Sequence, residues 1–333
     1  MQPSVMLSRR QLLLGSAAVA ATAGFGLPAS ALVIEGNSSI LIGYPPGGAT
    51  DTVARFLADK LRESYASTII VDNKPGANGQ IAAARLKDAP ADGTLMLLSP
   101  SPAIVISPHL YPTLSYAPLR DFKPVTLVST FPHLLAVGPG VPAEVKTIGD
   151  LLQWFKANPQ KASYGTPGNG SAPHFLGVEF GRAAGIALTH VPYKGDAPAL
   201  QDLLGGQIPL IIAPLGAVLP HVQAGKLRGL ATTGPARAAV LPDVPTIREA
   251  GFASVELTDW FGLFVPVATP AALIDKLHAC VRDALQTAHV REGLAKLAYE
   301  PGGELPTAYA DRVRAEYERW GPVVKLSGFK PEQ

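Results

Sequence analysis

Two glycine-rich segments carry the residue types and spacing best suited to binding chemistry. The first, residues 43–51, reads Gly-Tyr-Pro-Pro-Gly-Gly-Ala-Thr-Asp and precedes a predicted helix. Gly47 and Gly48 have no side chains, so a ligand can reach the backbone there. Unpaired N–H groups at a helix start, backed by the positive end of the helix dipole, bind anions. The segment therefore predicts a carboxylate site, and the alternative is an ordinary strand-to-helix turn.

The second segment, residues 164–174, reads Tyr-Gly-Thr-Pro-Gly-Asn-Gly-Ser-Ala-Pro-His ahead of another predicted helix. Its glycines, hydroxyls and helix start again describe an anion cradle. Gly165 and Gly170 have the spacing of a phosphate loop, but Ser171 stands where the phosphate-binding lysine belongs, so nucleotide binding is not expected. Two such segments predict a ligand whose carboxylate groups are held by facing helix starts.

The remaining composition argues against metal, cofactor and hydrolase chemistry. Cys280 is the only cysteine, which excludes an internal disulfide and cysteine-rich metal sites, and it is predicted to be a small buried side chain on a helix. The seven histidines show no metal-ligand spacing, and neither His-Glu-x-x-His nor Gly-x-Ser-x-Gly occurs. We expect no metal, no cofactor and no catalytic residue.

The N-terminus has the layout of a twin-arginine export signal. Arg9 and Arg10 are followed by an apolar run over residues 12–27 and by the small-residue site 29–31. The run is short and interrupted by glycines, so we expect cleavage after Ala31 and a periplasmic location; the alternative is an uncleaved N-terminal anchor. Loss of both arginines leaves equal numbers of basic and acidic side chains, which argues against nucleic-acid binding.

Apolar strands alternate with amphipathic segments along the chain. Strands are predicted at Ser39–Ile42, Thr68–Val71 and Leu95–Leu98, separated by helices over residues 51–63 and 81–86. This alternation predicts a parallel sheet with right-handed crossovers. Further strands are predicted at residues 134–137, 162–164, 188–191, 209–213, 229–232 and 263–266.

Two threonines are predicted helix caps. Thr147 precedes a helix with Asp150 in capping-box position. Thr269 is predicted to cap a long helix that has Pro270 as its first residue. A last helix is expected over residues 309–320.

These elements predict two α/β lobes with chain crossings near residues 130–132 and 250–259. The expected division is a signal peptide at 1–31, a discontinuous first lobe at 32–131 and 255–333, and a second lobe at 132–254.

Several segments together resemble the Bug or TctC-like family, the extracytoplasmic receptors of tripartite tricarboxylate transporters. They include the two glycine-rich segments and residues 71–79, 191–195, 199–207 and 260–264, and they cover essentially the whole mature chain. The resemblance implies a two-lobed type II periplasmic-binding-protein fold with a ligand cleft between the lobes. It also implies a small organic-acid ligand bound largely through backbone and water, and delivery to the membrane components of such a transporter. We expect a monomer.

The resemblance assigns ligand contacts to residues in four places along the chain: Tyr44, Gly48, Thr50 and Asp51; Ser99; Thr166, Gly168, Gly170, Ser171 and His174; and Tyr193 and Lys194. Single residues have alternatives. Asp51 either contacts a ligand amine or water or only favours the helix dipole. Lys194 either pairs with a carboxylate or is an exposed loop lysine, and His174 is expected to cap or pack at the helix start rather than to catalyse a reaction.

One segment departs from the family pattern. Residues 211–216 read Ile-Ile-Ala-Pro-Leu-Gly, where many members have a polar, often acidic, residue after the strand. This departure favours an acid with an apolar body.

Two other classes of protein fit the same residues. The first is an exported hydrolase or isomerase that uses Ser171, His174 and a carboxylate such as Asp51. The second is a receptor that presents its ligand to a sensor kinase instead of a transporter.

The export signal gives the first testable prediction. Changing both Arg9 and Arg10 to Lys should leave precursor protein in the cytoplasm, because the twin-arginine route requires the arginine pair. Cell fractionation followed by immunoblotting measures this. An undiminished amount of mature protein in the periplasm of the double variant would contradict the assigned route.

Overall fold

The computed structural model describes residues 34–62 and 64–329. The export signal and its cleavage site lie outside these residues and are not tested by the structure. None of the helices in the described part is long and apolar enough to cross a membrane.

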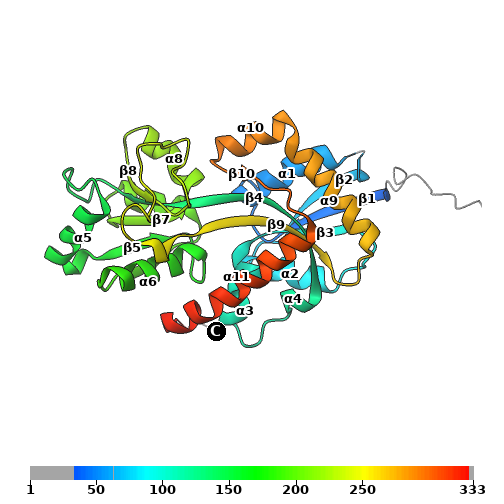
Figure 1. The fold of residues 1–333 in the computed structure, drawn as a ribbon, viewed down its shortest axis with the longest axis horizontal. Coiled ribbons are helices and arrows are strands. Elements are labelled where there is room, and N and C mark those ends of the chain that lie inside the picture. The colour runs from blue at the N-terminus through cyan, green and yellow to red at the C-terminus, as the bar shows by residue number, and fades with distance from the viewer. Residues whose placement is uncertain (1–33, 63, 330–333) are drawn as a thin grey trace, which may run out of the picture. The chain divides into compact units, whose positions relative to one another are not determined.

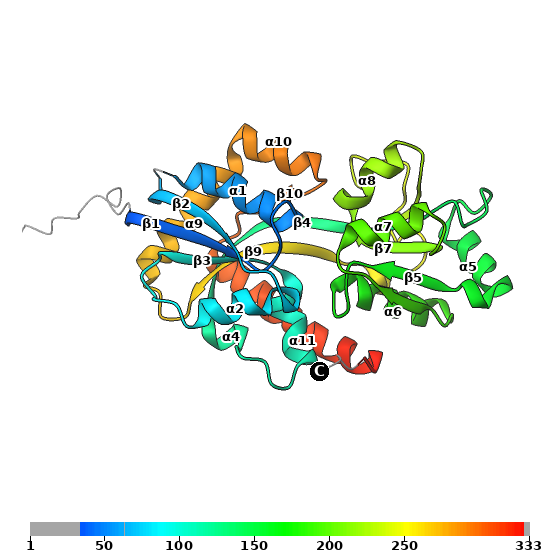
Figure 2. The ribbon, with the colours of Figure 1, turned by 180° about the vertical axis from the view of Figure 1, so that it is seen from behind.

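The described chain alternates strands and helices as the sequence predicts (Figures 1 and 2). The strands are β1 (Ile34–Ile42), β2 (Ala66–Asn73), β3 (Leu95–Pro100), β4 (Phe122–Val137), β5 (Ser163–Thr166), β6 (Thr189–Pro192), β7 (Leu210–Pro214), β8 (Arg228–Thr232), β9 (Thr258–Pro266) and β10 (Glu300–Pro301). The α-helices are α1 (Ala49–Leu61), α2 (Gln80–Lys87), α3 (Ser107–Leu110), α4 (Pro118–Asp121), α5 (Ile148–Ala157), α6 (Ala172–Ala184), α7 (Asp196–Leu204), α8 (Leu215–Gln223), α9 (Ala271–Gln286), α10 (Ala288–Lys296) and α11 (Pro306–Ser327). Shorter helical turns are η1 (Ala77–Gly79), η2 (Pro102–Ile106), η3 (Pro159–Lys161) and η4 (Ala253–Val255).

The first part of the chain forms the predicted parallel sheet. β1 lies between β2 and β3 and pairs with both in parallel, with Ile40 opposite Val71 and Met96. The sheet continues with β9 and β4, which are antiparallel to their neighbours. The late strand β9 thus lies in the middle of the early sheet, a pairing that the local sequence pattern did not specify.

The strand β4 connects this sheet to a second one. Up to Pro132 it pairs with β9, and from His133 onward it pairs with β7 and β8. In the second sheet β5 lies between β6 and β7, parallel to both. Figures 1 and 2 show β4 as one continuous arrow that runs from the first set of strands into the second.

The sequence predicted only the last four residues of β4. Pro124 and Pro132 lie in the unpredicted part, and prolines argue against a strand because they cannot donate to the ladder. The structure places Pro124 at an irregularity in the register with β9 and Pro132 at the last pair before β4 changes partners. At both places the missing N–H removes little from the pairing.

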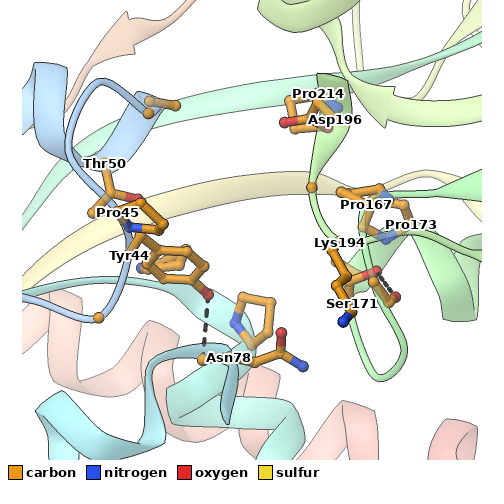
Figure 3. Close-up of a pocket in the computed structure, with 18 of the residues that line it drawn as sticks. Tyr44, Pro45, Thr50, Asn78, Pro167, Ser171, Pro173, Lys194, Asp196 and Pro214 are labelled. Carbon is orange, nitrogen blue, oxygen red and sulfur yellow. Dashed lines mark hydrogen bonds between the residues drawn. The ribbon is translucent and has the colours of Figure 1, made fainter. Parts of the chain in front are cut away.

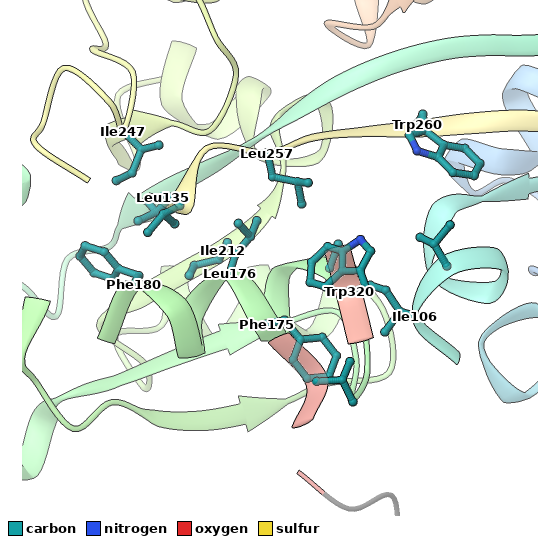
Figure 4. Close-up of a cluster of buried hydrophobic side chains, with 14 of the residues drawn as sticks. Ile106, Leu135, Phe175, Leu176, Phe180, Ile212, Ile247, Leu257, Trp260 and Trp320 are labelled. Atoms are coloured by element: carbon teal, nitrogen blue, oxygen red, sulfur yellow. The ribbon is translucent and has the colours of Figure 1, made fainter. Parts of the chain in front are cut away.

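A large buried cluster includes side chains that pack beneath both sheets. Trp320 of the C-terminal helix α11 lies against Phe175 of α6, with ring centroids 6.0 Å apart, and both rings are buried. Ile106, in the turn after β3, belongs to the same cluster (Figure 4). The helix α11 therefore contributes apolar surface to elements that adjoin each sheet.

The structure confirms one of the two predicted helix caps and contradicts the other. Thr147 caps α5: its Oγ1 accepts from the Asp150 backbone N–H at 3.1 Å, and Asp150 accepts from the Thr147 N–H at 3.0 Å. The prediction for Thr269 is wrong. Pro270 is the N-cap residue of α9, and the Thr269 hydroxyl is buried without a hydrogen-bond partner among the described residues. The extended Pro270 backbone carries Thr269 one residue beyond the capping position.

Cys280 also differs from its prediction. Its side chain is half-buried rather than buried, and its Sγ–H donates to the Ser64 carbonyl oxygen at 3.4 Å.

The two threonines make a matched test of capping. Thr147→Ala should lower the free energy of unfolding by about 1 kcal/mol, because an N-cap acceptor is lost. Thr269→Val should leave stability unchanged or raise it, because it keeps the shape and removes a buried hydroxyl that has no partner. Urea unfolding of both variants measures the two effects. Equal losses of stability in the two variants would contradict the assignment.

Candidate functional site

A cavity of about 990 Å³ opens where the carboxyl ends of strands from both sheets meet. Its walls come from the loop after β1, the turn around η1, the loop between β5 and α6, and the segment between β6 and α7 (Figure 3). Residues of β4 and β9 and the end of β7 complete it. Ligands of open α/β sheets bind at this place, because loops at the carboxyl ends of parallel strands converge there.

Asp51 stabilises the loop after β1, which is called the first loop below. Its Oδ2 accepts from the Gly47 backbone N–H at 3.0 Å and from Arg55 Nε at 2.8 Å. Its Oδ1 accepts from Asn73 Nδ2 at 3.0 Å. The side chain is buried and is not among the residues that line the cavity. Asp51 thereby links the loop after β1 to α1 and β2.

This network also sets the acidity of Asp51. Burial alone would raise the pKa of its carboxyl group, but hydrogen bonds from Arg55, Gly47 and Asn73, together with the Arg55 charge, lower the pKa to about 2. The carboxylate is therefore ionised throughout the physiological range.

The turn around η1 packs closely under the first loop. A Cβ atom on Gly43 would lie 2.3 Å from the Gly79 Cα, so a side chain cannot be accommodated there. Tyr44 Oη donates to the Asn78 carbonyl oxygen at 3.3 Å, as Figure 3 shows. Asn78 Nδ2 in turn donates to the Asn169 carbonyl oxygen at 2.9 Å. Asn169 belongs to the loop between β5 and α6, which is called the second loop below. The first and second loops are thus connected across the cavity.

Ser171 shapes the second loop as the N-cap of α6. Its Oγ accepts from the His174 backbone N–H at 3.3 Å and donates to the Gly168 carbonyl oxygen at 2.7 Å. Gly170 has a φ of 70°, a conformation that favours glycine, and its N–H donates to His174 Nδ1 at 3.2 Å. The serine hydroxyl thus donates to the loop backbone and not to the histidine ring.

A stacked pair of imidazoles supports this loop. The rings of His174 and His190 lie 3.9 Å apart and nearly parallel, and His190 Nε2 is 2.7 Å from Thr166 Oγ1. Burial lowers the pKa of His174 to about 4, and burial together with the neighbouring His174 lowers the pKa of His190 to about 3. Both rings are therefore uncharged at neutral pH and act as packing and hydrogen-bonding groups.

The fourth wall segment lies between β6 and α7. Tyr193 Oη donates to Asp202 Oδ2 at 2.7 Å, which fixes the ring against α7. Burial and this carboxylate raise the pKa of Tyr193 to about 12. Lys194 is exposed on the cavity wall and forms no ion pair within the part of the chain that the structure describes. The helix α7 then begins at Asp196 without a side-chain cap.

The predicted ligand contacts divide into two groups. The cavity is lined by Tyr44, Gly48, Thr50, Gly168, Ser171, Tyr193 and Lys194. It is not lined by Asp51, Ser99, Thr166, Gly170 and His174. Ser99 is buried, and its Oγ–H donates to the Pro100 carbonyl oxygen at 2.9 Å.

Sequence reasoning missed several polar residues of the wall: Asn78, His133, Asp196, Asp259 and Tyr299. Asn78 lies within residues 71–79 and Asp196 directly follows residues 191–195. Both segments contribute to the family resemblance, so they could have suggested these two residues. His133 lies opposite Pro214 of β7, and Asp259 lies opposite Phe131 of β4; no local pattern shows that these pairings bring the two residues to the cavity. Nowhere in the described residues do three His, Cys, Asp or Glu side chains gather as metal ligands would.

Solved structures of similar fold define the class of protein. The structure of R. palustris Rpa4515 with adipate has 33% sequence identity and a TM-score of 0.81, and the match covers 90% of this chain and 99% of that one. MatC from Rhodopseudomonas palustris with bound malate has 30% identity and a TM-score of 0.77, over 87% and 99% of the two chains. The fold is that of a periplasmic binding protein, as the resemblance predicted.

The family follows from the sequence match. The profile of the tripartite tricarboxylate transporter family receptor, TctC, matches residues 53–329, and the chain belongs to that family. The protein BugT of Bordetella pertussis is 33% identical over 312 residues, which are 93% of this chain and 95% of BugT. The chain is therefore a periplasmic solute receptor of a binding-protein family, and the enzyme alternative is wrong.

The Asp51 network gives a stability prediction. Asp51→Asn places an NH₂ group or a weaker acceptor against the Gly47 and Arg55 donors, so it should lower the free energy of unfolding by about 2 kcal/mol at pH 7. Because the folded pKa lies below the unfolded one, the advantage of the aspartate is full above about pH 4 and is lost as the pH falls through 2. Urea unfolding at several pH values measures both.

Asp59→Asn is the matched control on the same helix. Its carboxylate is exposed and lies 3.8 Å from Arg62, so its loss should cost less than about 0.5 kcal/mol. A pH-independent loss in Asp51→Asn would contradict the proposed charge effect.

Proposed function

We propose that this receptor captures a small organic acid in the cavity and delivers it to the membrane components of a tripartite tricarboxylate-type transporter. The observation that carries the proposal is that the starts of α1 and α6 and the side chain of Lys194 all line the same cavity. Relatives solved with adipate and malate support a carboxylate as the ligand.

Backbone N–H groups at the start of α1 can donate to an anion in the cavity. The helix α1 begins after Gly48 without a side-chain cap, so the amides of its first turn have no side-chain acceptor among the described residues. Residues 48–50 line the cavity, and the helix dipole places partial positive charge there. An anion can replace the missing acceptors.

Lys194 adds a positive charge to the cavity. It is a positively charged side chain on the cavity wall, near Ser171 in Figure 3. A carboxylate at this position would gain a charge-assisted hydrogen bond in addition to the amides. We assign ligand contacts to the predicted residues that line the cavity. We assign loop support to Asp51, Thr166, Gly170 and His174.

The lobes proposed from the sequence fit this mechanism. We propose a first lobe of residues 32–131 and 255–333 and a second lobe of residues 132–254. The change of β4 partners after Pro132 and the start of β9 at Thr258 support these boundaries. Hinge bending at the two crossings would open and close the cavity around a ligand.

The ligand class is tested by calorimetry on the mature protein with a panel of mono-, di- and tricarboxylates that includes adipate and malate. Lys194→Gln should weaken binding of the best acid about tenfold, which corresponds to about 1.4 kcal/mol. Lys296→Gln removes an exposed lysine from α10, outside the cavity wall, and should leave affinity unchanged. Failure of every acid to bind would contradict the proposal.

Delivery to a transporter is distinguished from delivery to a sensor kinase by uptake. Deletion of the receptor gene should abolish uptake of the radiolabelled acid that binds. Undiminished uptake, together with loss of ligand-dependent transcription, would support the sensor alternative instead.

A further inference from the structure

A pair of buried ionisable side chains lies at the cavity where β4 changes partners. His133, the first residue of β4 to pair with β7, is 1% exposed, and Asp259 on β9 is 4% exposed. His133 Nε2 is 3.4 Å from Asp259 Oδ2. Asp259 Oδ1 accepts from the Trp260 backbone N–H at 2.7 Å, which fixes the carboxylate. Both residues line the cavity.

The pair has unused hydrogen-bonding capacity. Although His133 Nε2 lies near Asp259 Oδ2, neither ring nitrogen of His133 forms a hydrogen bond among the described residues. The buried Asp196 Oδ1 likewise has no hydrogen-bond partner there. Asp196 also lines the cavity, at the start of α7. Buried polar atoms are normally paired, so these atoms point to a group that is supplied by the ligand.

The charges of these groups act on the same space. Burial raises the pKa of Asp196 to about 6, and the nearby His133 opposes the rise. Burial, with Asp196 and Asp259, also raises the pKa of Tyr299, another residue of the wall. Two carboxyl side chains, Asp196 and Asp259, and one imidazole, His133, share this part of the cavity wall, so carboxyl groups outnumber basic groups there.

Aromatic rings adjoin the same place. Phe131 packs against Tyr299 at 4.8 Å and Phe261 at 5.0 Å between ring centroids, and it meets the His133 ring edge-on at 5.8 Å. All three rings line the cavity. Aromatic faces beside carboxylates attract cations.

The positive and negative parts of the wall are separate. Figure 3 shows Lys194 and Ser171 at one place and Asp196 at another. Lys194 forms no ion pair with Asp196 in the described structure, although only one residue stands between them in the chain. A ligand can therefore place a carboxylate at the first position and a different group at the second.

We propose that Asp196, Asp259 and His133 form an amine-binding subsite, so that the preferred ligand is an amino-carboxylic acid. This inference rests on the proposed function, because the carboxylate of the ligand occupies the Lys194 position. A protonated amine satisfies the unpaired Asp196 oxygen and balances the excess negative charge. A hydroxyl group could satisfy the oxygen but not the charge.

The test compares acids that differ by one substituent, using calorimetry on the mature protein. Succinate, malate and aspartate carry hydrogen, hydroxyl and ammonium at the same carbon. Adipate with 2-aminoadipate, and hexanoate with 6-aminohexanoate, vary the length and the position of the amine. In at least one set the amine should bind ten times more tightly than its partners.

Variants then locate the effect. Asp196→Asn should weaken the preferred amine at least tenfold while leaving its amine-free partner unchanged or tighter. His133→Gln provides a second variant and should likewise lower the ratio of the affinity for the preferred amine to the affinity for its amine-free partner. Asp283→Asn removes an exposed carboxylate from α9 and should change neither affinity. Thermal melts confirm that each variant is folded.

The outcomes separate the two proposals. Amine-free acids that bind as tightly as amines in every set, or a hydroxyl that equals the ammonium, would overturn the amine subsite and leave carboxylate capture standing. Equal weakening of amine and partner by Asp196→Asn would also overturn it. Failure of every acid, amine or not, would contradict carboxylate capture itself and the subsite with it.

Discussion

The antiparallel pairing of β4 with β9 is the constraint on which the rest of the structure depends. The pairing runs from Phe122 opposite Pro266 to Pro132 opposite Thr258, and β4 then continues into the second sheet. The parallel strands β1 and β5 lead their loops to the cavity because each belongs to a sheet that includes β4. The proposed hinge and the buried His133–Asp259 pair lie on the same two strands, so ligand contact and lobe movement would be directly coupled.

Several polar side chains that suggest chemistry in the sequence instead support backbone in the fold. Asp51 ties Gly47 to Arg55 and Asn73, and Ser171 closes its own loop by donating to Gly168. Such buried networks hold loops in one shape because each unmade hydrogen bond would be costly. The loops can then offer backbone N–H groups to the cavity, where side chains would be less rigid.

The sequence predicted the elements well where the signal was local. The alternation from β1 to β3 and the Thr147 cap needed only hydrophobic spacing and a short motif. Prediction failed where tertiary context decided. The pattern does not predict most of β4 because prolines argue against a strand. It predicts Thr269 as a cap because proline is common at the first position of a helix, whereas Pro270 is itself the N-cap residue of α9. The place of His133 at the cavity depends on the change of β4 from β9 to β7 as its partner, and both partners are distant in the sequence.

The apolar segment at residues 211–216 acquires a different meaning in the folded chain. Its isoleucines are buried in β7, and Pro214 alone of these residues lines the cavity. Polar groups reach the cavity instead from β4, β9 and the start of α7. The wall therefore combines apolar surface, from Pro214 and aromatic rings, with polar groups of opposite charge. The proposed amine subsite fits this wall, because an ammonium group there would face Asp196 and Asp259, whereas a carboxylate at the same place would face like charge.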